Sequence, residues 1–396
     1  MTVRRFATLP DAVALVHDAL ATYGGAERVL ATVAELLPTA PIHTLVFDPQ
    51  AVHGTSLEGR EIHTSFVDRL PCARHHYRLM LPFLPLAAEG FDLTPFDVVL
   101  SFHYAVAHGV LTRPDQFHLS YTYTPLRHAW QQQRDFLRSL PPPARPLARP
   151  VLHHFRLWDR AAADGVDRFV AISRWIAACI WRAYRRRAPV VYPPVDVDAF
   201  EPGGTRGDHY LTLARLERHK RVDVVVEAFA HLDRPLLVVG DGPQRRALAR
   251  RATPNVQFLG RVTHRELIDI MGRARGLVHA AEEDFGIALV EAQAAGCPVV
   301  AYAGGAAPEL VKEGHTGVLF RSQTPEAVRE AIETLEGLPR LRDADLRKHA
   351  ERFSTERFEA EFQRVVEQAW DRFRTRRPGE DRRPGRTQPA ASLVDA

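Results

Sequence analysis

Two glutamates, Glu283 and Glu291, lie at either end of a short apolar run that contains Gly286, in the stretch EEDFGIALVE. An apolar strand, GLVHAA, precedes this stretch, and a helix is predicted to begin near Gly286 and to end before the next glycine. The first backbone N–H groups of such a helix, those of Gly286, Ile287 and Ala288, have no partner inside the helix and favour an anion. The pattern therefore predicts a phosphate site.

The two acids suggest what is attached to that phosphate. Glu283 falls in the loop beside one end of the ligand, and Glu291, in the second turn of the helix, is placed to accept hydrogen bonds from hydroxyls at the other end. An acid near each end suits a nucleotide sugar, which consists of hexose, diphosphate and ribose. The alternative is that Glu283 only caps the helix and Glu291 is a solvated helix position.

A diphosphate also needs positive charge, from side chains or from a metal ion. The segment LARLERHKRVD follows a predicted strand and carries Arg215 and Lys220. Lysine is scarce, with only three in the chain, so Lys220 inside an arginine-rich loop indicates a compact ammonium group at a specific place. A solvated basic loop is the alternative. The pair Asp196 and Asp198 falls in a linker and favours turn chemistry, so no metal ion is expected.

Apolar runs alternate with helical patterns throughout the chain, which predicts parallel sheets with helices on both faces, an α/β doubly wound fold. In such sheets ligands bind at the carboxyl ends of the strands. In the first half, strands are predicted at 13–20, 42–47, 96–102, 117–123, 168–173 and 189–194. In the second half, they are predicted in HYLTLAR, PLLVVGDG, VQFLGRV, GLVHAA, PVVAYAGG and TGVLF.

The length of 396 residues, with 45% apolar and 25% charged residues, is that of a globular protein with two domains. A polar linker after Val195 predicts a first domain at 1–195 and a second at 196–355, with a cleft between them. An amphipathic helix is predicted at 356–375, and the Arg-, Pro- and Gly-rich residues 376–396 are predicted to be disordered.

Charge and cysteine content narrow the partners and the compartment. The net charge of +4, without an aromatic and basic binding motif, favours phosphate-bearing ligands or an anionic membrane surface over nucleic acid. The three cysteines have neither metal-ligand nor disulfide spacing, which favours a reducing, cytoplasmic environment. No signal-peptide core or membrane-spanning run is expected, so the protein is soluble or peripheral on the inner face of a membrane.

An ordered set of motifs resembles glycosyltransferase family 4, retaining enzymes of the GT-B fold. These motifs are GGAE at 24–27, Arg215 with Lys220, GDGP at 240–243, FLGRV at 258–262 and the Glu283 to Glu291 element. The resemblance runs from about Val13 to Phe373 and implies two Rossmann-like domains facing a cleft, with a C-terminal helix that crosses back to the first domain. VHDALATYGGAERVL, YTYTPLRHAW and VVYPPVDVDAF further resemble the subgroup that builds bacterial surface polysaccharides, often mannosyltransferases that use lipid-linked acceptors.

The resemblance implies roles on the donor side. Arg215 and Lys220 would bind the diphosphate, Glu283 the donor sugar and Glu291 the ribose. The backbone around Arg261 would meet the base, and two glycines would let the opposing loop approach the phosphates. The implied donor-binding residues are Gly24, Gly25, Arg215, Lys220, Arg261, Val262, Phe285, Gly286, Ile287 and Glu291. The implied donor is a nucleotide diphosphate hexose, with GDP-mannose as the first candidate, and neither a cofactor nor a metal ion is required.

The implied catalytic residues are Glu283, Arg215, Lys220 and Tyr123. Relatives commonly carry a histidine at the position of Tyr123, so this chain departs from the family pattern there. On the acceptor side, His103 and Arg127 are expected to contact a lipid-linked or saccharide acceptor, with a structural histidine and a surface salt bridge as the alternatives. The segment 74–91 mixes basic, aromatic and apolar residues and fits either a membrane surface or the core of the first domain.

Other functions remain open. A nicotinamide-dependent oxidoreductase ranks low, because LLVVGDGPQRRAL lacks the three-glycine fingerprint. A catalytically inactive nucleotide-sugar-binding protein is an alternative because of Tyr123, and a nucleotide-sugar epimerase of the same fold is another. The sequence does not specify an oligomeric state.

Overall fold

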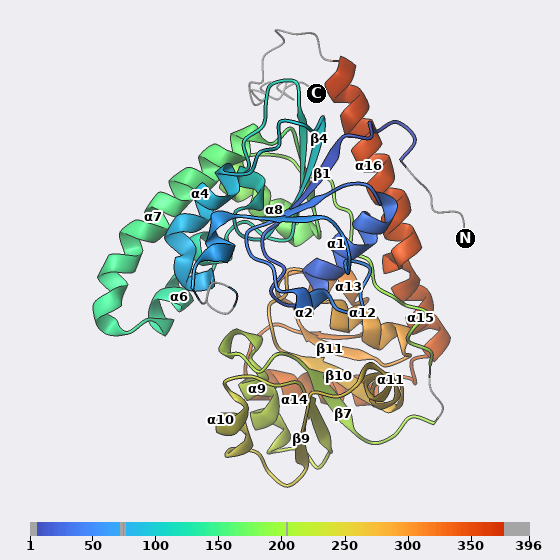
Figure 1. Cartoon of the computed structure of the whole chain (residues 1–396). Coiled ribbons are helices and arrows are strands. Elements are labelled where there is room, and N and C mark those ends of the chain that lie inside the picture. Colours follow the sequence, from blue (N-terminus) through green and yellow to red (C-terminus); the bar gives the residue numbers. More distant parts are fainter. Residues whose placement is uncertain (1–5, 72–73, 75–76, 203–204, 376–396) are drawn as a thin grey trace, which may run out of the picture.

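The computed structural model describes residues 6–375 apart from 72–73, 75–76 and 203–204. The chain forms two lobes, each built on a six-stranded parallel sheet (Figure 1). The strands of the first lobe are β1 (Val13–His17), β2 (Ile42–Thr44), β3 (Ile62–Thr64), β4 (Val98–His103), β5 (Phe117–Thr122) and β6 (Arg168–Ala171). Those of the second lobe are β7 (Tyr210–Leu213), β8 (Leu236–Val239), β9 (Val256–Gly260), β10 (Gly276–His279), β11 (Val299–Tyr302) and β12 (Gly317–Phe320).

The two sheets share one topology. The strand order is β3-β2-β1-β4-β5-β6 in the first and β12-β11-β10-β7-β8-β9 in the second, and both are the doubly wound order. The order reverses between β1 and β4 in one lobe and between β7 and β10 in the other, which are the places where such sheets bind ligands. The predicted α/β, doubly wound fold is confirmed.

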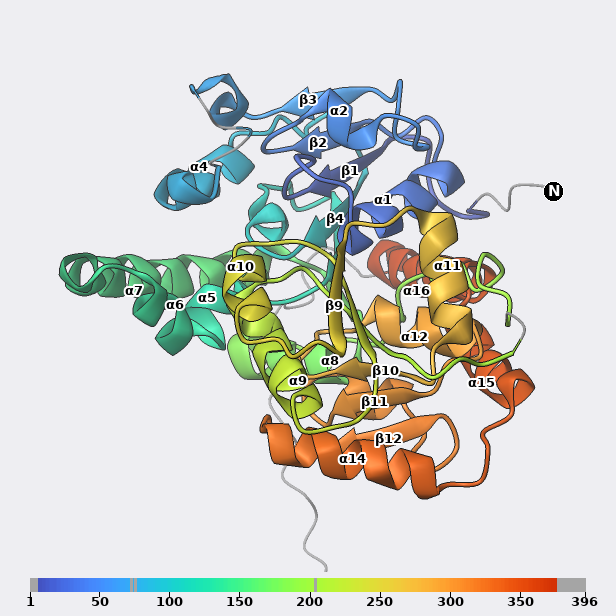
Figure 2. The same cartoon turned by 90° about the horizontal axis from the view of Figure 1, so that it is seen from below.

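Helices cover both faces of each sheet, and Figure 2 shows the two lobes from below, with β1 to β4 on one side and β10 to β12 on the other. In the first lobe they are α1 (Gly25–Leu36), α2 (Pro49–Val52), α4 (Leu84–Glu89), α5 (Arg127–Trp130), α6 (Gln133–Ser139), α7 (Arg145–Ala162) and α8 (Arg174–Tyr184). In the second lobe they are α9 (Val222–Phe229), α10 (Arg245–Ala249), α11 (His264–Arg273), α12 (Ile287–Ala294), α13 (Ala307–Leu310), α14 (Pro325–Gly337) and α15 (Asp343–Ala350).

One predicted strand of the first lobe is wrong. The segment 189–194 makes only an isolated bridge, between Ala171 and Val190, and the sixth strand of the sheet is β3 instead. Pro189, Pro193 and Pro194 have no N–H group to donate to a neighbouring strand, so the segment cannot continue a ladder. The short edge strand β3 lacks the continuous apolar run that marks the other strands.

The last helix, α16 (Thr355–Thr375), returns from the second lobe and packs along the first (Figure 1). Phe358 and Phe362 contact the ring of Tyr121 on β5, with centroids 5.9 and 5.7 Å apart. Further along, the ring of Trp370 lies 5.9 Å from that of Phe117. The crossing helix that the family resemblance implied is therefore present. The segment 376–396, which was predicted to be disordered, lies outside the described residues.

The loops at the carboxyl ends of the two sheets face each other and are tied together. Glu309 of the second lobe accepts hydrogen bonds from the backbone N–H groups of Arg174 and Trp175 at the start of α8, at 2.8 and 2.9 Å. Ser173 donates to the carbonyl oxygen of Asp284 at 2.7 Å. The two lobes therefore meet at the edges where ligands are expected.

Candidate active site

The site is built around the start of α12, where the predicted anion position is found. Gly286 is the N-cap residue and has φ 105°, a left-handed conformation that favours glycine. Among the described residues, the backbone N–H groups of Gly286, Ile287 and Ala288 have no hydrogen-bond acceptor. Three donors and the positive end of the helix therefore point out of one turn, which is the arrangement that binds a phosphate.

Glu283 lies directly before this turn, in a fixed position. Its carbonyl oxygen accepts from the N–H of Ala306 at 2.8 Å. Its carboxylate contacts Lys220 Nζ at 2.7 Å and His279 Nε2 at 3.0 Å. Burial opposes the charged form, but Lys220 and His279 outweigh it and hold the pKa of Glu283 well below its usual range. Glu283 is therefore a partly buried, ionised carboxylate.

Lys220 and Arg215 both lie in the loop that follows β7, as predicted. Lys220 ends a short 3-10 helix, Arg218–Lys220, and the next residue, Arg221, has φ 51°. The Arg215 side chain is 60% exposed and contacts Glu217 at 3.4 Å. The two cations thus differ in their contacts and exposure. The ammonium of Lys220 is held by Glu283, whereas the guanidinium of Arg215 is exposed to solvent and accessible to a ligand.

The loop with Gly24 and Gly25 in the first lobe faces α12. A Cβ atom on Gly25 would lie 2.7 Å from Cδ1 of Ile287, so the glycine lets the two lobes approach. In the next turn, Arg28 Nη1 contacts Glu291 Oε1 at 3.1 Å, and the Glu291 residue is only 6% exposed. Before any ligand binds, the carboxylate predicted to hold the ribose is therefore paired with a cation of the opposite lobe.

The side chain of Glu27 binds the glycine loop from its buried side. Its Oε2 accepts from the N–H of Gly24 at 2.9 Å, and its Oε1 lies 4.0 Å from Nε2 of His17. Burial raises the pKa of Glu27 to about 7, although the charge of Arg215 acts in the opposite direction. Glu27 therefore titrates near neutral pH at the lobe interface.

Tyr123, where relatives commonly carry a histidine, lies beneath the glycine loop. Its hydroxyl donates to the carbonyl oxygen of Ala26 at 2.8 Å, and its ring packs against those of His17 and Tyr104. The residue is 8% exposed. In this position Tyr123 supports the first turn of α1, so its effect on a ligand passes through the glycine loop.

The two predicted acceptor residues differ in position. His103 is fully buried, and its Nδ1 lies 3.1 Å from Nδ1 of His108, so the structure does not bring it to the lobe interface. Arg127 does reach the interface, but its guanidinium pairs with the carboxylate of Asp284. Of the two, only Arg127 remains placed to meet an acceptor.

One group in the described part of the chain has the composition of a metal-ligand set: His103, His108 and Asp159. Nδ1 of His108 lies 3.1 Å from Nδ1 of His103, and Nε2 of His108 lies 3.2 Å from the backbone carbonyl oxygen of Asp159. Oδ2 of Asp159 accepts from Trp130 and Tyr184 at 2.6 and 2.9 Å. These residues form a buried hydrogen-bond chain.

The remaining predicted donor residues differ in exposure. Phe285 is 4% exposed and packs against the rings of Tyr192 and Phe353, so it belongs to the core beneath the anion turn. Arg261 and Val262 follow β9, where Arg261 is exposed and Val262 is half-buried. The backbone around these two residues is open to a ligand.

The sequence did not single out four residues of this region. They are Arg28, His279, Asp284 and Glu309. His279 had a signal, because it ends the strand before the loop and lies four residues before Glu283. The other three act across the interface between the lobes, and nothing local in the sequence marks such partners.

Family comparisons agree with this geometry. A family model described as Glycosyltransferase Family 4 matches residues 23–199, and one described as Glycosyl transferases group 1 matches residues 204–353. Each lobe therefore matches a glycosyltransferase family, and the two matches together span most of residues 23–353. The first match covers the lobe with the glycine loop, and the second covers the lobe with Lys220 and the anion turn.

Individual glycosyltransferases match over part of the chain. The D-rhamnosyltransferase WbpZ of Pseudomonas aeruginosa is 27% identical over 209 residues, 48% of this chain and 53% of that protein. The D-inositol 3-phosphate glycosyltransferase of Mycobacterium tuberculosis is 32% identical over 227 residues, 49% of this chain and 47% of that protein. The matched region thus spans about half the length of these relatives.

Solved structures match over nearly the whole chain and show the same fold. Sucrose-phosphate synthase from Thermosynechococcus elongatus has a TM-score of 0.70 at 17% identity and covers 91% of this chain and 99% of its own. Anabaena HepE in complex with UDP and glucose has a TM-score of 0.68 at 16% identity and covers 90% and 100%. Two six-stranded lobes with a returning helix are thus the GT-B architecture.

Proposed function

We propose that this protein is a retaining hexosyltransferase that moves a hexose from a nucleotide diphosphate sugar to a lipid-linked or polysaccharide acceptor. The observation that carries the proposal is the Lys220–Glu283 ion pair beside the open N–H groups at Gly286. A cation, a carboxylate and an anion-binding turn match the phosphate and sugar of such a donor. The names of the matching relatives, a rhamnosyltransferase and an inositol phosphate glycosyltransferase, support the same reaction class.

In the reaction, the bond between the anomeric carbon and the leaving diphosphate breaks, and the acceptor oxygen bonds to the same face of that carbon. The acceptor proton passes to the departing phosphate oxygen. Negative charge then develops on the diphosphate, where Arg215, Lys220 and the N–H groups of the turn stabilise it. Positive charge develops on the sugar ring, and the ionised Glu283 stabilises it from nearby.

Side chains and backbone supply the positive charge in this proposal, so the enzyme is proposed to be independent of divalent metal ions. Arg215 is exposed, and the ammonium of Lys220 has three N–H donors, so it can bind Glu283 and a phosphate oxygen together. Transfer in the presence of EDTA should equal transfer without it. Loss of transfer on chelation, restored by added Mg²⁺ or Mn²⁺, would contradict this.

The acceptor is proposed to be reached at a cytoplasmic membrane surface. None of the described helices is both long enough and apolar enough to cross a bilayer. On α7, however, Leu147 and Leu157 are 73% and 56% exposed, next to the exposed basic residue Arg149. On the neighbouring segment, Phe83 and Leu86 are 56% and 60% exposed. Apolar side chains flanked by basic ones suit an anionic membrane interface.

The donor is proposed to be GDP-mannose. The motifs shared with surface-polysaccharide mannosyltransferases support this choice, whereas the similar HepE structure holds UDP and glucose. A thermal-shift series with GDP, UDP, ADP and dTDP distinguishes the bases, because a ligand that binds only the folded state raises Tm. GDP should give the largest increase. A larger increase in Tm with UDP would identify the base as uracil and reject GDP-mannose as the donor.

Turnover tests the proposal directly. The protein is incubated with labelled GDP-mannose and a bacterial membrane lipid extract, and glycosylated lipid is separated and quantified. Labelled lipid should form, and its new glycosidic bond should keep the α configuration of the donor. The Glu283→Gln variant should form no labelled lipid. Release of a different nucleotide hexose without acceptor would indicate an epimerase. Donor binding without any product would indicate an inactive nucleotide-sugar-binding protein.

A further inference from the structure

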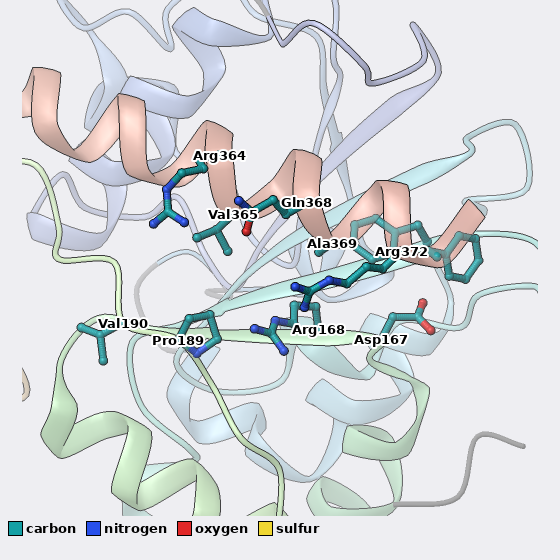
Figure 3. A pocket seen from close by; sticks show the side chains of 11 residues that line it. Asp167, Arg168, Pro189, Val190, Arg364, Val365, Gln368, Ala369 and Arg372 are labelled. Carbon is teal, nitrogen blue, oxygen red and sulfur yellow. The ribbon is translucent and has the colours of Figure 1, made fainter. Parts of the chain in front are cut away.

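A pocket lies between α16 and the sheet of the first lobe (Figure 3). Its volume is about 220 Å³. Phe117 and Arg168 contribute from the starts of β5 and β6, and Arg364, Gln368 and Arg372 contribute from successive turns of α16. Because Phe117 and Arg168 begin their strands, the pocket lies at the amino end of the sheet, opposite the candidate active site.

Three arginines give this pocket a positive charge. Among the described residues, Arg168, Arg364 and Arg372 have neither a hydrogen bond nor an ion pair to an acidic group. Figure 3 shows the guanidinium groups of Arg168 and Arg372 lying close together. Burial lowers the pKa of Arg168, and the charges of Arg372 and Arg186 lower it further, as expected for neighbouring cations.

The one carboxylate that lines the pocket is already engaged. Oδ2 of Asp167 accepts from the backbone N–H of His118 at 3.0 Å, on the sheet side. The neighbouring Arg186 binds the carbonyl oxygens of Val166 and Asp167 at 2.6 and 3.2 Å. One carboxylate balances only one of the three arginine charges, so the lining of the pocket keeps an excess of positive charge.

We propose that this pocket binds a small phosphate-bearing anion. Arginine guanidinium groups present paired N–H donors that match phosphate oxygens. Arg168 and Arg372 lie close enough to bind one anion together, and Arg364, about two turns away on α16, adds positive charge at the side of the pocket. The Gln368 amide supplies a further donor, and the ring of Phe117 offers an apolar wall. The volume lies below the range of sites for drug-sized ligands, so a monophosphate of a small metabolite or the headgroup of an anionic lipid is the size that fits.

The position of the pocket gives such binding a consequence for the whole protein. Pro189 and Val190 line it and lead into the segment that crosses to the second lobe, and α16 is the helix that crosses back. An anion held by Arg168 and Arg372 would therefore join β6 to the returning helix. Binding should raise the Tm of the protein.

The test uses calorimetric titration of the full-length protein with inorganic phosphate and with glucose 1-phosphate. The variant Arg364→Gln/Arg372→Gln should bind each probe at least about tenfold more weakly than the wild type. Arg357→Gln removes an arginine from the same helix outside the pocket and is the matched control. Because phosphate can also bind at the start of α12, Lys220→Ala is titrated as well and should retain the pocket's binding.

Vesicles distinguish the two sources of phosphate. Co-sedimentation is measured with phosphatidylcholine vesicles that contain or lack phosphatidylglycerol. If phosphatidylglycerol-dependent binding weakens in Arg364→Gln/Arg372→Gln but not in Arg357→Gln, the anion is a lipid headgroup, and if only the soluble probes bind, it is a metabolite. The proposal is overturned if the double variant, folded by circular dichroism, matches the wild type in every titration, or if the wild type binds no probe at millimolar concentration.

Discussion

Glu283 combines two tasks in one side chain. Its carboxylate holds the ammonium of Lys220 at 2.7 Å and also accepts from His279. Because both partners favour the charged form, the carboxylate stays ionised over the whole physiological pH range. In the proposed reaction it would therefore orient the cation for the diphosphate and provide negative charge for the sugar ring at the same time.

Replacing Lys220 tests this coupling. In Lys220→Ala the diphosphate loses a charged donor and Glu283 loses its main counter-ion, so kcat for transfer should fall by a factor of about 10² to 10³. The measurement is steady-state transfer from the proposed donor, GDP-mannose. Lys312→Ala, which removes an exposed lysine elsewhere, should leave kcat unchanged. An unchanged kcat in Lys220→Ala would remove Lys220 from the catalytic machinery.

The buried His118 should make stability depend on pH. Burial lowers its pKa to about 3, and its Nε2 lies 2.8 Å from the hydroxyl of Ser101. In the unfolded chain the imidazole takes up a proton below about pH 6.5, whereas the folded protein excludes it, so this contribution is complete above that pH and is lost as the pH falls toward 3. At pH 5 the loss should be ~2 kcal/mol.

Urea unfolding of the wild type and His118→Gln at pH 7 and pH 5 measures this effect. The variant should lose ~2 kcal/mol less than the wild type between the two pH values. His53→Gln, on the surface, is the control for removing an imidazole. Equal pH dependence in the wild type and His118→Gln would show that the buried ring is protonated in the folded protein.

At the scale of elements, the turn into α12 depends on one glycine. Gly286 has φ 105°, and a Cβ atom there would lie 3.1 Å from Cδ1 of Leu289. Gly286→Ala should therefore lower the free energy of unfolding by about 1–2 kcal/mol. It should also weaken donor binding, because the N–H groups of the turn would be redirected.

Denaturant unfolding and donor titration check this prediction. Gly337→Ala is the matched control, because Gly337 ends α14 and an added Cβ meets no atom within 4 Å. Alanine at Gly337 should leave stability equal or slightly raised. If Gly286→Ala kept both stability and donor affinity, the left-handed turn would not be required for the site.

Much of this fold could be predicted from the sequence because buried parallel strands are continuously apolar. All six predicted strands of the second lobe contain an observed strand, and the helix at Gly286 begins where expected. The prediction failed at 189–194, where three apolar residues are flanked by prolines, and at β3, a three-residue strand at the sheet edge. Short edge strands are specified by the neighbouring strand more than by their own residues.

Only the part of the candidate site that comes from the second lobe could be predicted from the sequence. Glu283, Gly286 and Lys220 follow strands of the second lobe, so the topology alone brings them to one edge. The pairing of Arg28 with Glu291 joins residues 263 positions apart, and no local pattern specifies it. The expected contact of His103 with an acceptor meets a related problem. The strand of His103 ends at the expected edge, but its side chain points toward His108 in the buried hydrogen-bond chain.

At the scale of the whole molecule, Glu309 makes several of the polar contacts between the two lobes, beside the apolar core that they share. Glu309 accepts two backbone N–H groups at the start of α8 and a third hydrogen bond from Tyr192, whose hydroxyl lies 3.1 Å away. A carboxylate at a helix N-terminus is stabilised by the helix dipole, and here the carboxylate belongs to the opposite lobe. Glu309 therefore stabilises the arrangement in which the two lobes contact each other, called the closed state below.

Replacing Glu309 should open the molecule without unfolding it. In Glu309→Ala, the radius of gyration measured by small-angle scattering should increase in the absence of ligand, and KM for the donor should rise more than kcat falls. Glu313→Ala, an exposed acid nearby in the sequence, should behave as the wild type. A wild-type scattering profile and KM for Glu309→Ala would show that other contacts set the closed state.

The returning helix α16 also sets the order in which the protein can be completed during synthesis. Tyr121 and Phe117, on β5 beside the edge strand β6, are covered by Phe358, Phe362 and Trp370. The ribosome releases those covering residues only after the whole second lobe has been translated, so until then the first lobe keeps an apolar surface uncovered. A nascent chain of this kind needs protection from aggregation in that interval, although its lobe was translated first.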